Sequence, residues 1–348
     1  MRIKKNCVLS LDKFIDESLY NKKLGYYMKG DPFGSNGDFI TGPNISVLFS
    51  EMIAIWIISF WESLDCPKQF NLIELGAGNG EMMATMTSTF NRFPNFKNSC
   101  NIKIFEKSKY LREVQKKTIK DYKIKWLNSL NDLNNSPCIF IANEFFDALP
   151  FKQFIKKKSR WYERYVKFKD NIKSEYLDIP FDIKKFEKKI KFKISLKQNF
   201  IEYSPLASKY LKNITNKISL NNGGILIIDY GYLEKEMKNT IQAVSKHKYA
   251  NILNNFRNSD ITYNLSFSLI SQIIKKFGSF YQTTTTQREF LTKLGILKRA
   301  EILSKNLPFS KKADMYFRIK RLIDDKQMGN LFKVKFVTNK KNKFKLGF

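Results

Sequence analysis

Apolar runs alternate with polar, glycine-bearing turns along most of the chain and predict strands and helices in alternation. Short runs rich in Ile, Leu and Phe are typical of strands buried in a parallel sheet. They cover residues 72–75, 102–106, 123–126, 138–142 and 224–229. Longer amphipathic or apolar stretches predict helices over residues 9–20, 45–64 and 81–86. Strands that alternate with helices indicate an α/β fold with a mainly parallel sheet.

A different pattern separates the fourth and fifth of these strands. Between Gln153 and Tyr203, apolar and polar residues alternate, most clearly over residues 161–168 and 190–196, which predicts an antiparallel β insert. Two late strands, near residues 280–284 and 331–337, are expected to close a seven-stranded, Rossmann-like sheet. We therefore expect four parts: an N-terminal helical and lid region (1–65), the first half of the Rossmann-like domain (66–150), the β-rich insert (151–203) and the second half with its helices (204–348).

The first predicted strand leads into a turn with glycine at every second position. Residues 74–80 are Glu-Leu-Gly-Ala-Gly-Asn-Gly, and open α/β sheets bind ligands at such carboxyl ends of strands. The third glycine comes one position too early for the dinucleotide fingerprint, and Glu81 is a poor neighbour for a pyrophosphate. The next strand ends in Glu106, where an acceptor for ribose hydroxyls is expected. This combination resembles the S-adenosylmethionine site of class I methyltransferases. An ordinary glycine-rich turn with a solvated glutamate is the alternative.

The loop after the fourth strand carries a second cluster of polar residues. Residues 143–150 are Asn-Glu-Phe-Phe-Asp-Ala-Leu-Pro, and in a parallel sheet this loop faces the same crevice as the glycine turn. Methylases of base or amide nitrogens have Asn/Asp-Pro-Pro-aromatic at this place, whereas here Glu144 and Asp147 bring carboxylates. Two carboxylates suit a cationic substrate, since they accept paired hydrogen bonds from a guanidinium. Asp147 suits the N-cap of a following helix equally well.

The charge balance changes this picture little. A formal net charge of +30, from 62 Lys and Arg against 32 Asp and Glu, is typical of proteins that bind nucleic acid. However, the lysines are spread along the whole chain together with much Asn and Ile, which indicates an A+T-rich genome. In the two densest stretches, residues 184–197 and 333–345, lysine partly alternates with apolar residues, as in strands with one solvated face. Nucleic acid is therefore the less favoured partner.

Cysteine and histidine usage argues against a metal site. The four cysteines form no Cys-x-x-Cys pair, and the chain has one histidine, His247. The apolar segment 52–61 is too short to span a bilayer, and the N-terminus does not read as a signal peptide. We expect a reduced, cytoplasmic protein without a metal or a membrane span.

Further blocks run in order along nearly the whole chain. They are residues 25–27, 33–43, 74–80, 142–150, 229–231, 240–244 with His247, 260–262, 287–291 and 328–333. Together they resemble the MidA-type methyltransferases, bacterial and mitochondrial proteins tied to the assembly of respiratory complex I. The chain departs from the family pattern at Asn264 and Ser266, where the family usually has His and Asp, and at Asn79 and Gly42, where Arg and Ala are usual.

The resemblance implies an S-adenosyl-L-methionine-dependent protein arginine N-methyltransferase. Its expected protein substrate is the quinone-site core subunit of respiratory complex I (NADH dehydrogenase), whose assembly it would assist. Two alternatives use the same fold: an RNA methyltransferase and a non-catalytic assembly chaperone. The oligomeric state is open between a monomer and a homodimer.

These arguments assign roles to particular residues. The expected cofactor-binding residues are Glu74, Gly76, Gly78, Gly80, Glu106, Leu127, Asn128 and Asn143. The expected catalytic residue is Glu144, with Asp147 or Asp229 as the second carboxylate. The glycine- and tyrosine-rich loop 25–43 is expected to act as a lid, with a packed Ω-loop as the alternative. The expected substrate and lid residues are Gly37, Asp38, Phe39, Thr41 and His247, although a lone histidine between lysines is also typical of a surface.

Overall fold

The computed structural model describes residues 6–30, 41–120, 122–169, 174–245 and 248–348. Its main sheet has the strand order β15-β16-β10-β5-β2-β3-β4, and the short β14 pairs with the end of β10. These strands are β2 (Phe70–Leu75), β3 (Cys100–Phe105), β4 (Lys125–Leu127), β5 (Cys138–Asn143), β10 (Gly223–Tyr232), β14 (Leu265–Ser266), β15 (Phe280–Thr286) and β16 (Phe332–Asn339). The sheet therefore has eight strands rather than the expected seven, because the two-residue β14 is too short to leave a periodic pattern.

The main sheet is mixed. Strands β4, β3, β2, β5 and β10 are parallel neighbours, whereas β16 is antiparallel to both β10 and β15. All six residues of β2 are buried, and alternate residues enter opposite cores: Leu72 joins one and Ile73 the other. Burial on both faces explains why these strands are nearly continuous apolar runs in the sequence.

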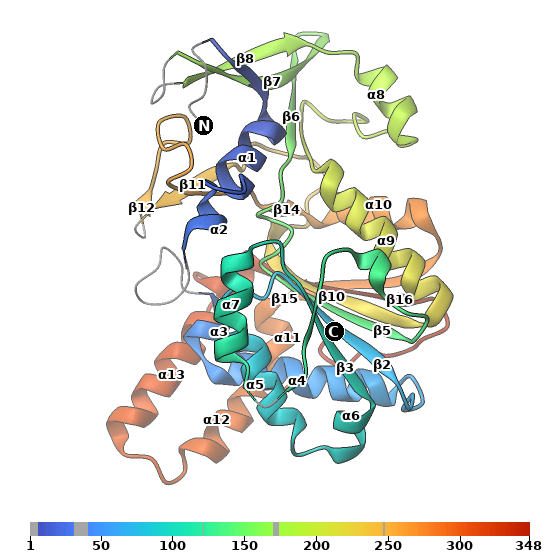
Figure 1. Cartoon of the computed structure of the whole chain (residues 1–348), viewed down its shortest axis with the longest axis vertical. Coiled ribbons are helices and arrows are strands. Elements are labelled where there is room, and N and C mark those ends of the chain that lie inside the picture. The colour runs from blue at the N-terminus through green and yellow to red at the C-terminus, as the bar shows by residue number, and fades with distance from the viewer. Residues whose placement is uncertain (1–5, 31–40, 121, 170–173, 246–247) are drawn as a thin grey trace.

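Helices cover both faces of the main sheet (Figure 1). One face packs on α4 (Val47–Glu62), α5 (Glu81–Phe90), α6 (Pro94–Ser99), α11 (Gln287–Lys293), α12 (Ile296–Ser304) and α13 (Phe309–Ile323). The other packs on α9 (Pro205–Asn221) and α10 (Phe267–Phe277). The remaining helices are α1 (Leu11–Tyr20), α2 (Tyr26–Lys29), α3 (Gly42–Ile45), α7 (Lys109–Thr118), α8 (Ile183–Ile190), α14 (Met328–Leu331) and the 3₁₀ turn η1 (Leu130–Asp132). The mostly apolar α4 is buried along most of its length, as expected for a core helix.

A second, antiparallel sheet lies where the sequence predicts the insert. It is built from β6 (Lys152–Lys157), β7 (Arg160–Phe168), β8 (Ser174–Pro180) and β9 (Phe200–Tyr203), and β1 (Val8–Ser10) joins it from the N-terminus. Figure 1 shows this sheet at the opposite end of the molecule from α12 and α13, with α1 near it. Because β1 pairs with β7, the N-terminal segment is tied to the insert.

The prediction of a strand within residues 184–197 is wrong. This stretch begins with α8, whose N-cap Asp182 accepts a hydrogen bond from the backbone N–H of Lys185. Ile183, Phe186 and Ile190 are spaced by three and four residues and pack on the core, so the helical period prevails over the apparent alternation with lysine.

A third sheet of three short strands was not predicted. It has the order β12-β11-β13 and consists of β11 (Gln242–Ser245), β12 (Lys248–Tyr249) and β13 (Asp260–Thr262). All three residues of β13 are buried. This sheet supplies one wall of the cavity described next.

Candidate functional site

A cavity of about 550 Å³ opens at the carboxyl ends of the central parallel strands. Gly76 and Gly78 follow β2, Glu106 follows β3, and Glu144 follows β5, and all four line the cavity. The opposite walls come from α1, α2 and the β11–β13 sheet. The position agrees with the rule that open α/β sheets bind ligands beyond the carboxyl ends of their strands.

The glycine turn exposes bare backbone to this cavity. Gly76 and Gly78 have φ angles of +67° and +53°, in the left-handed region that favours glycine. A Cβ on Gly76 would lie 2.8 Å from the Phe145 ring, so no side chain fits there without displacing it. The Phe145 ring thus packs against Gly76, and both glycines line the cavity without a side chain of their own.

Glu106 is held in a fixed orientation beside the glycine turn. Its Oε1 accepts a hydrogen bond from the Ser108 backbone N–H at 2.8 Å, and its Oε2 accepts one from Gln115 Nε2 at 3.3 Å. Burial raises the pKa of the Glu106 carboxyl group, and these hydrogen bonds oppose the rise.

Gln115 connects the residues around Glu106. Its Nε2 also donates to the carbonyl oxygen of Gly78 at 2.9 Å, and its Oε1 accepts from Trp126 Nε1 at 2.8 Å. The side chain is fully buried. Sequence reasoning missed this residue, because a glutamine in an amphipathic helix gives no signal of its own.

Five of the expected cofactor-binding residues do not line the cavity. Glu74 is buried within β2, where burial and the nearby Glu106 raise its pKa to about 8, and its Oε2 has no hydrogen-bond partner among the described residues. Gly80 is the N-cap of α5. The Leu127 carbonyl and the Asn128 side chain accept hydrogen bonds from Arg112, and Asn143 donates one to Glu144.

Glu144 stands on the cavity wall in an unusual conformation. Its φ of +49° is left-handed, which costs a non-glycine residue about 1–3 kcal/mol. The backbone is fixed by its N–H, which donates to the Ile228 carbonyl at 2.9 Å, and the carboxyl group accepts from Gly42 N–H at 3.4 Å. Burial raises the pKa of this carboxyl group to about 7. Strain of this kind, kept in place by neighbouring bonds, is typical of functional residues.

Asp147 and Asp229 have different surroundings, although both were expected as the second carboxylate. Asp147 lines the cavity, is 4% exposed, and its Oδ1 has no partner among the described residues. Asp229 does not line it. One oxygen of Asp229 accepts from the N–H groups of Phe146 and Asp147 at 3.0 and 3.3 Å, and the other accepts from Tyr230 N–H at 2.9 Å. Asp229 therefore supports the loop that presents Asp147.

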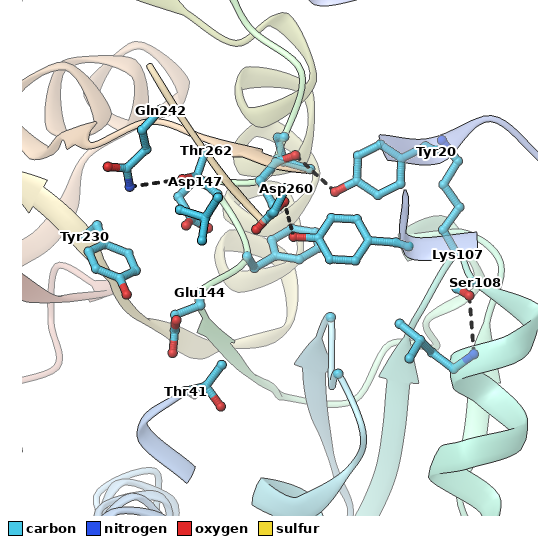
Figure 2. A pocket seen from close by; sticks show the side chains of 18 of the residues that line it. Tyr20, Thr41, Lys107, Ser108, Glu144, Asp147, Tyr230, Gln242, Asp260 and Thr262 are labelled. Carbon is cyan, nitrogen blue, oxygen red and sulfur yellow. Dashed lines mark hydrogen bonds between the residues drawn. The ribbon is translucent and has the colours of Figure 1, made fainter. Parts of the chain in front are cut away.

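A third carboxylate, Asp260, reaches the cavity from β13. Figure 2 shows Glu144, Asp147 and Asp260 around one space, with Tyr230 to one side and Tyr20 to the other. Asp260 Oδ1 accepts a hydrogen bond from the Tyr27 hydroxyl at 2.7 Å. Burial first, and then Asp229, Glu144 and Asp260, raise the pKa of Asp147 well above its usual range. The cavity lining is thus acidic on balance, with four carboxyl groups and two lysines, Lys107 and Lys248.

Asp260 and Tyr27 were not predicted as site residues. Both lie in blocks of the family resemblance, at residues 25–27 and 260–262, but nothing in the sequence gave them a role. Tyr20, at the end of α1, donates its hydroxyl to the Ala148 carbonyl at 3.0 Å and completes this wall.

Thr41 is the one expected lid residue that the structure describes. It lines the cavity, and its hydroxyl donates to Asn44 Oδ1 at 2.8 Å. Gly37, Asp38, Phe39 and His247 lie outside the described residues. In the part of the chain that is described, no cluster of His, Cys, Asp and Glu has the make-up of a metal site. No helix in that part has the length and apolarity needed to cross a bilayer.

The sheet, the glycine turn and the acid after β3 define a Rossmann-like protein of the class that binds nucleoside cofactors at its strand ends. The chain belongs to the family of S-adenosyl-L-methionine-dependent methyltransferases, whose model matches residues 52–284. It is therefore a methyltransferase, and S-adenosyl-L-methionine is its cofactor.

Individual relatives agree with the family. The chain is 27% identical to the mitochondrial protein arginine methyltransferase NDUFAF7 of Xenopus tropicalis, over 95% of this chain and 83% of the relative. The human protein of that name is 26% identical over 95% of this chain and 80% of its own length. A crystallised Burkholderia thailandensis protein bound to S-adenosyl-homocysteine superposes with a TM-score of 0.80 at 22% identity, covering 98% of this chain and 90% of that chain. This last likeness establishes the fold.

The comparisons correct one expectation. A cytoplasmic location was predicted from the cysteine usage and the N-terminus, but the curated relatives are named as mitochondrial proteins, so this prediction is wrong. Free cysteines are compatible with any reducing compartment and do not select one.

The described residues fit the cofactor. Gly76 and Gly78 line the cavity without side chains, and the Glu106 carboxylate is oriented beside them as an acceptor for hydroxyl groups. The carboxyl groups that line the cavity match a cofactor that carries an ammonium and a sulfonium rather than phosphates. These residues agree with the family assignment.

Proposed function

We propose that this protein methylates a guanidino nitrogen of an arginine side chain in a protein substrate. The observation that supports this most is that Glu144, Asp147 and Asp260 surround one space in the cavity, with Asp260 reaching it from the opposite wall. In a chain with a net charge of +30, a cavity lined by four carboxyl groups and two lysines departs strongly from the average composition. Such a site attracts a cation and repels the phosphates of RNA.

A guanidinium suits this wall better than a lysine ammonium does. Its five N–H donors lie in a planar fork and bind carboxylates in pairs, so several acidic side chains are satisfied by one group. Burial is the main reason why the pKa values of Glu144 and Asp147 are raised, and the neighbouring carboxylates add to the rise. An incoming guanidinium reverses this effect and stabilises the carboxylate forms.

The proposed roles follow from these positions. S-adenosyl-L-methionine, when bound, supplies an electrophilic methyl group on a positively charged sulfur. Gly76 and Gly78 admit the cofactor, and Glu106 accepts from its ribose hydroxyls. Glu144 holds the receiving nitrogen in line and takes up the proton that this nitrogen loses on methylation, since a carboxyl group with a pKa of about 7 accepts and releases protons near neutral pH. Asp147 and Asp260 hold the rest of the guanidinium.

Asp229 acts differently in this proposal. It orients the 144–148 loop through its hydrogen bonds to backbone N–H groups and does not touch the substrate. In the same proposal, Glu74 balances cofactor charge from behind the turn, Leu127 and Asn128 flank the adenine, and the loop 25–43 is the lid.

The protein substrate is proposed from the relatives. They are named protein arginine methyltransferases, and the resemblance to the MidA type indicates the quinone-site core subunit of respiratory complex I as the target. The four-part division of the chain is proposed on the same basis, with the 151–203 insert contributing to substrate docking.

Mass spectrometry of the recombinant core subunit, after incubation with enzyme and S-adenosyl-L-methionine, tests this proposal. We expect arginine methylation by the parent, and losses of at least about a hundredfold in Glu144→Gln and Asp260→Asn, because each removes a charged hydrogen-bond acceptor. Asp314→Asn, which removes an exposed carboxylate on α13, is the matched control and keeps full activity.

Cofactor binding separates failure of the substrate proposal from failure of the site. Gly78→Val places a branched side chain at a left-handed position of the cavity wall, so calorimetry should detect cofactor binding by the parent and not by this variant. Binding without methylation of any arginine would leave the site in place and reject the arginine substrate. Equal binding by Gly78→Val would reject the site.

A further inference from the structure

The helical hairpin formed by α12 and α13 exposes large apolar side chains far from the cavity. It projects from the lower part of the molecule in Figure 1. Its inner side is buried through Ile296, Ala300, Ile319 and Leu322. Its outer side carries the hairpin patch, which we define as Ile302 (59% exposed), Leu303 (39%), Phe309 (86%) and Phe317 (64%).

The hairpin patch is organised rather than scattered. Leu303 and Phe309 flank the connecting loop 305–308, so they lie at the tip of the hairpin. On α13, residues 309, 313 and 317 are Phe, Ala and Phe at every fourth position, which places them along one face of the helix. The helix therefore has a second apolar stripe besides the one that packs on the core. Exposed apolar groups that gather in this way mark an interaction surface.

Uncompensated positive charge surrounds the hairpin patch. Residues 296–323 contain eight Lys and Arg and two acidic residues, a net charge of +6. The two acids are already paired, Glu301 with Lys298 and Asp314 with Arg318, and Arg299 pairs with Glu51 of α4. Five cations have no ion-pair partner among the described residues: Lys305, Lys311, Lys312, Lys320 and Arg321.

We propose that the hairpin patch attaches this protein to the surface of a membrane that contains anionic lipids. Phe309, Phe317 and their apolar neighbours enter the headgroup region, and the surrounding lysines pair with lipid phosphates. Apolar side chains on one helix face with flanking Lys and Arg are the combination that anionic bilayer surfaces bind.

The composition favours lipid over a protein partner. Protein interfaces are enriched in Tyr, Trp and Arg and are depleted in Lys. Here four of the five unpaired cations are lysines, and Leu303 and Phe309 lie next to the connecting loop of a projecting hairpin. A flexible ammonium on a long stem reaches a headgroup phosphate while its methylenes cover apolar surface.

Vesicle sedimentation with the full chain tests the proposal. The probes are vesicles of phosphatidylcholine alone and of phosphatidylcholine mixed with phosphatidylglycerol. We expect the parent to sediment with the anionic vesicles and far less with the neutral ones. The double variant Phe309→Ser/Phe317→Ser should lower the partition coefficient at least about tenfold. Lys311→Gln/Lys312→Gln should lower it about fivefold for each lysine removed.

Matched controls are available elsewhere on the chain. Leu220→Ser removes an 80% exposed leucine from α9, and Lys188→Gln/Lys189→Gln removes two exposed lysines from α8. Both should sediment like the parent. Calorimetry with S-adenosyl-L-methionine verifies that every variant is folded, since no substituted residue lies on the cavity wall.

Three results would overturn the proposal. The first is a parent protein that sediments with neither kind of vesicle. The second is a Phe309→Ser/Phe317→Ser variant that binds anionic vesicles as well as the parent does. The third is a parent dimer in sedimentation velocity that the same variant abolishes without any vesicle binding, because the hairpin patch would then join two copies of this chain.

Discussion

At the scale of single residues, Glu144 determines how the cavity responds to pH. Its carboxyl group is buried, which raises its pKa to about 7, and a guanidinium prefers the ionised form. An arginine peptide should therefore bind about tenfold more weakly at pH 6 than at pH 8, since one proton must leave on binding. Calorimetry with the cofactor product present measures this dependence. In Glu144→Gln the slope should vanish; a slope that persists would assign the titration to Asp147 or Asp260.

Glu74 makes an independent prediction about stability. Burial and Glu106 raise the pKa of Glu74 from its ordinary value of 4.5 to about 8 in the folded protein. A carboxyl group whose folded pKa is the higher one binds its proton more tightly in the folded state. Stability is therefore lost as pH rises from 4.5 to 8, by at most about 5 kcal/mol.

Denaturant unfolding of the parent and Glu74→Gln at pH 6 and pH 8.5 measures this loss. The uncharged glutamine keeps the size of the side chain and has no proton to release, so the variant should lose less stability between the two pH values. Exposed Glu301→Gln is the control and should follow the parent. An equal loss in the parent and Glu74→Gln would show that other buried carboxyl groups, such as Glu144, dominate.

Some of these residues could be predicted from the sequence because they directly follow predicted strands. Gly76, Gly78, Glu106 and Glu144 each lie at a strand end, and parallel strand ends meet at one edge of a sheet. Gln115, Tyr27 and Asp260 had no such marker. Their position depends on how α7, α2 and β13 pack. Tyr27 and Asp260 are 233 positions apart, and Gln115 reaches the Gly78 carbonyl 37 positions away, so these contacts leave no local pattern.

At the scale of elements, α7 links the glycine turn to the acid after β3. Gln115 binds Gly78, Glu106 and Trp126 at once, so it holds the two halves of the proposed cofactor site in register. Gln115→Leu should weaken S-adenosyl-L-methionine binding about tenfold, because Glu106 would remain buried with one donor fewer. Calorimetry measures the affinity, and Gln272→Leu on the exposed face of α10 is the control. Unchanged affinity with a lowered melting temperature would make Gln115 purely structural.

Element length explains where the sequence predicted the fold and where it failed. The strands β2, β5, β10 and β16 are six to ten residues long and buried on both faces, so composition alone marks them. The failures are short or ambiguous. β14 has two residues and β13 three, and each forms only because its partner strand is already in place. In α8, the alternation of lysine with apolar residues resembles the pattern of a strand, but Ile183, Phe186 and Ile190 have the spacing of a helix.

At the scale of the whole molecule, charge is divided between the surface and the cavity. The whole chain has a net charge of +30, whereas the cavity lining has four carboxyl groups and two lysines. The acidic cavity therefore attracts an arginine side chain, and the basic hairpin attracts an anionic membrane surface. The two partners do not compete. The hairpin patch and the cavity lie on different elements, so membrane attachment leaves the cavity wall unchanged.

The four parts of the chain should nevertheless unfold together. One hydrophobic core contains Leu11, Ile73, Phe154 and Ile225, one residue from each part. Phe14 of α1 is fully buried, and its ring lies 5.8 Å from that of Phe168 in β7 and 5.1 Å from that of Phe256. The N-terminal helix thus joins the insert to the rest of the core, and removing its ring should weaken every part.

Phe14→Ala should lower the free energy of unfolding by about 3–5 kcal/mol, whereas the control Phe309→Ala, at an 86% exposed position, should change it by less than about 0.5 kcal/mol. Tryptophan fluorescence follows two regions: Trp161 reports on the insert, and Trp56, Trp61 and Trp126 report on the core around α4. The Trp161 signal is obtained by comparing proteins in which Trp161 is kept or replaced by Phe. Within the parent, this signal and that of the other tryptophans should have one common unfolding midpoint, and the same should hold within Phe14→Ala. An earlier transition for Trp161 would mean that the insert folds as a separate unit and that α1 does not couple it to the sheet.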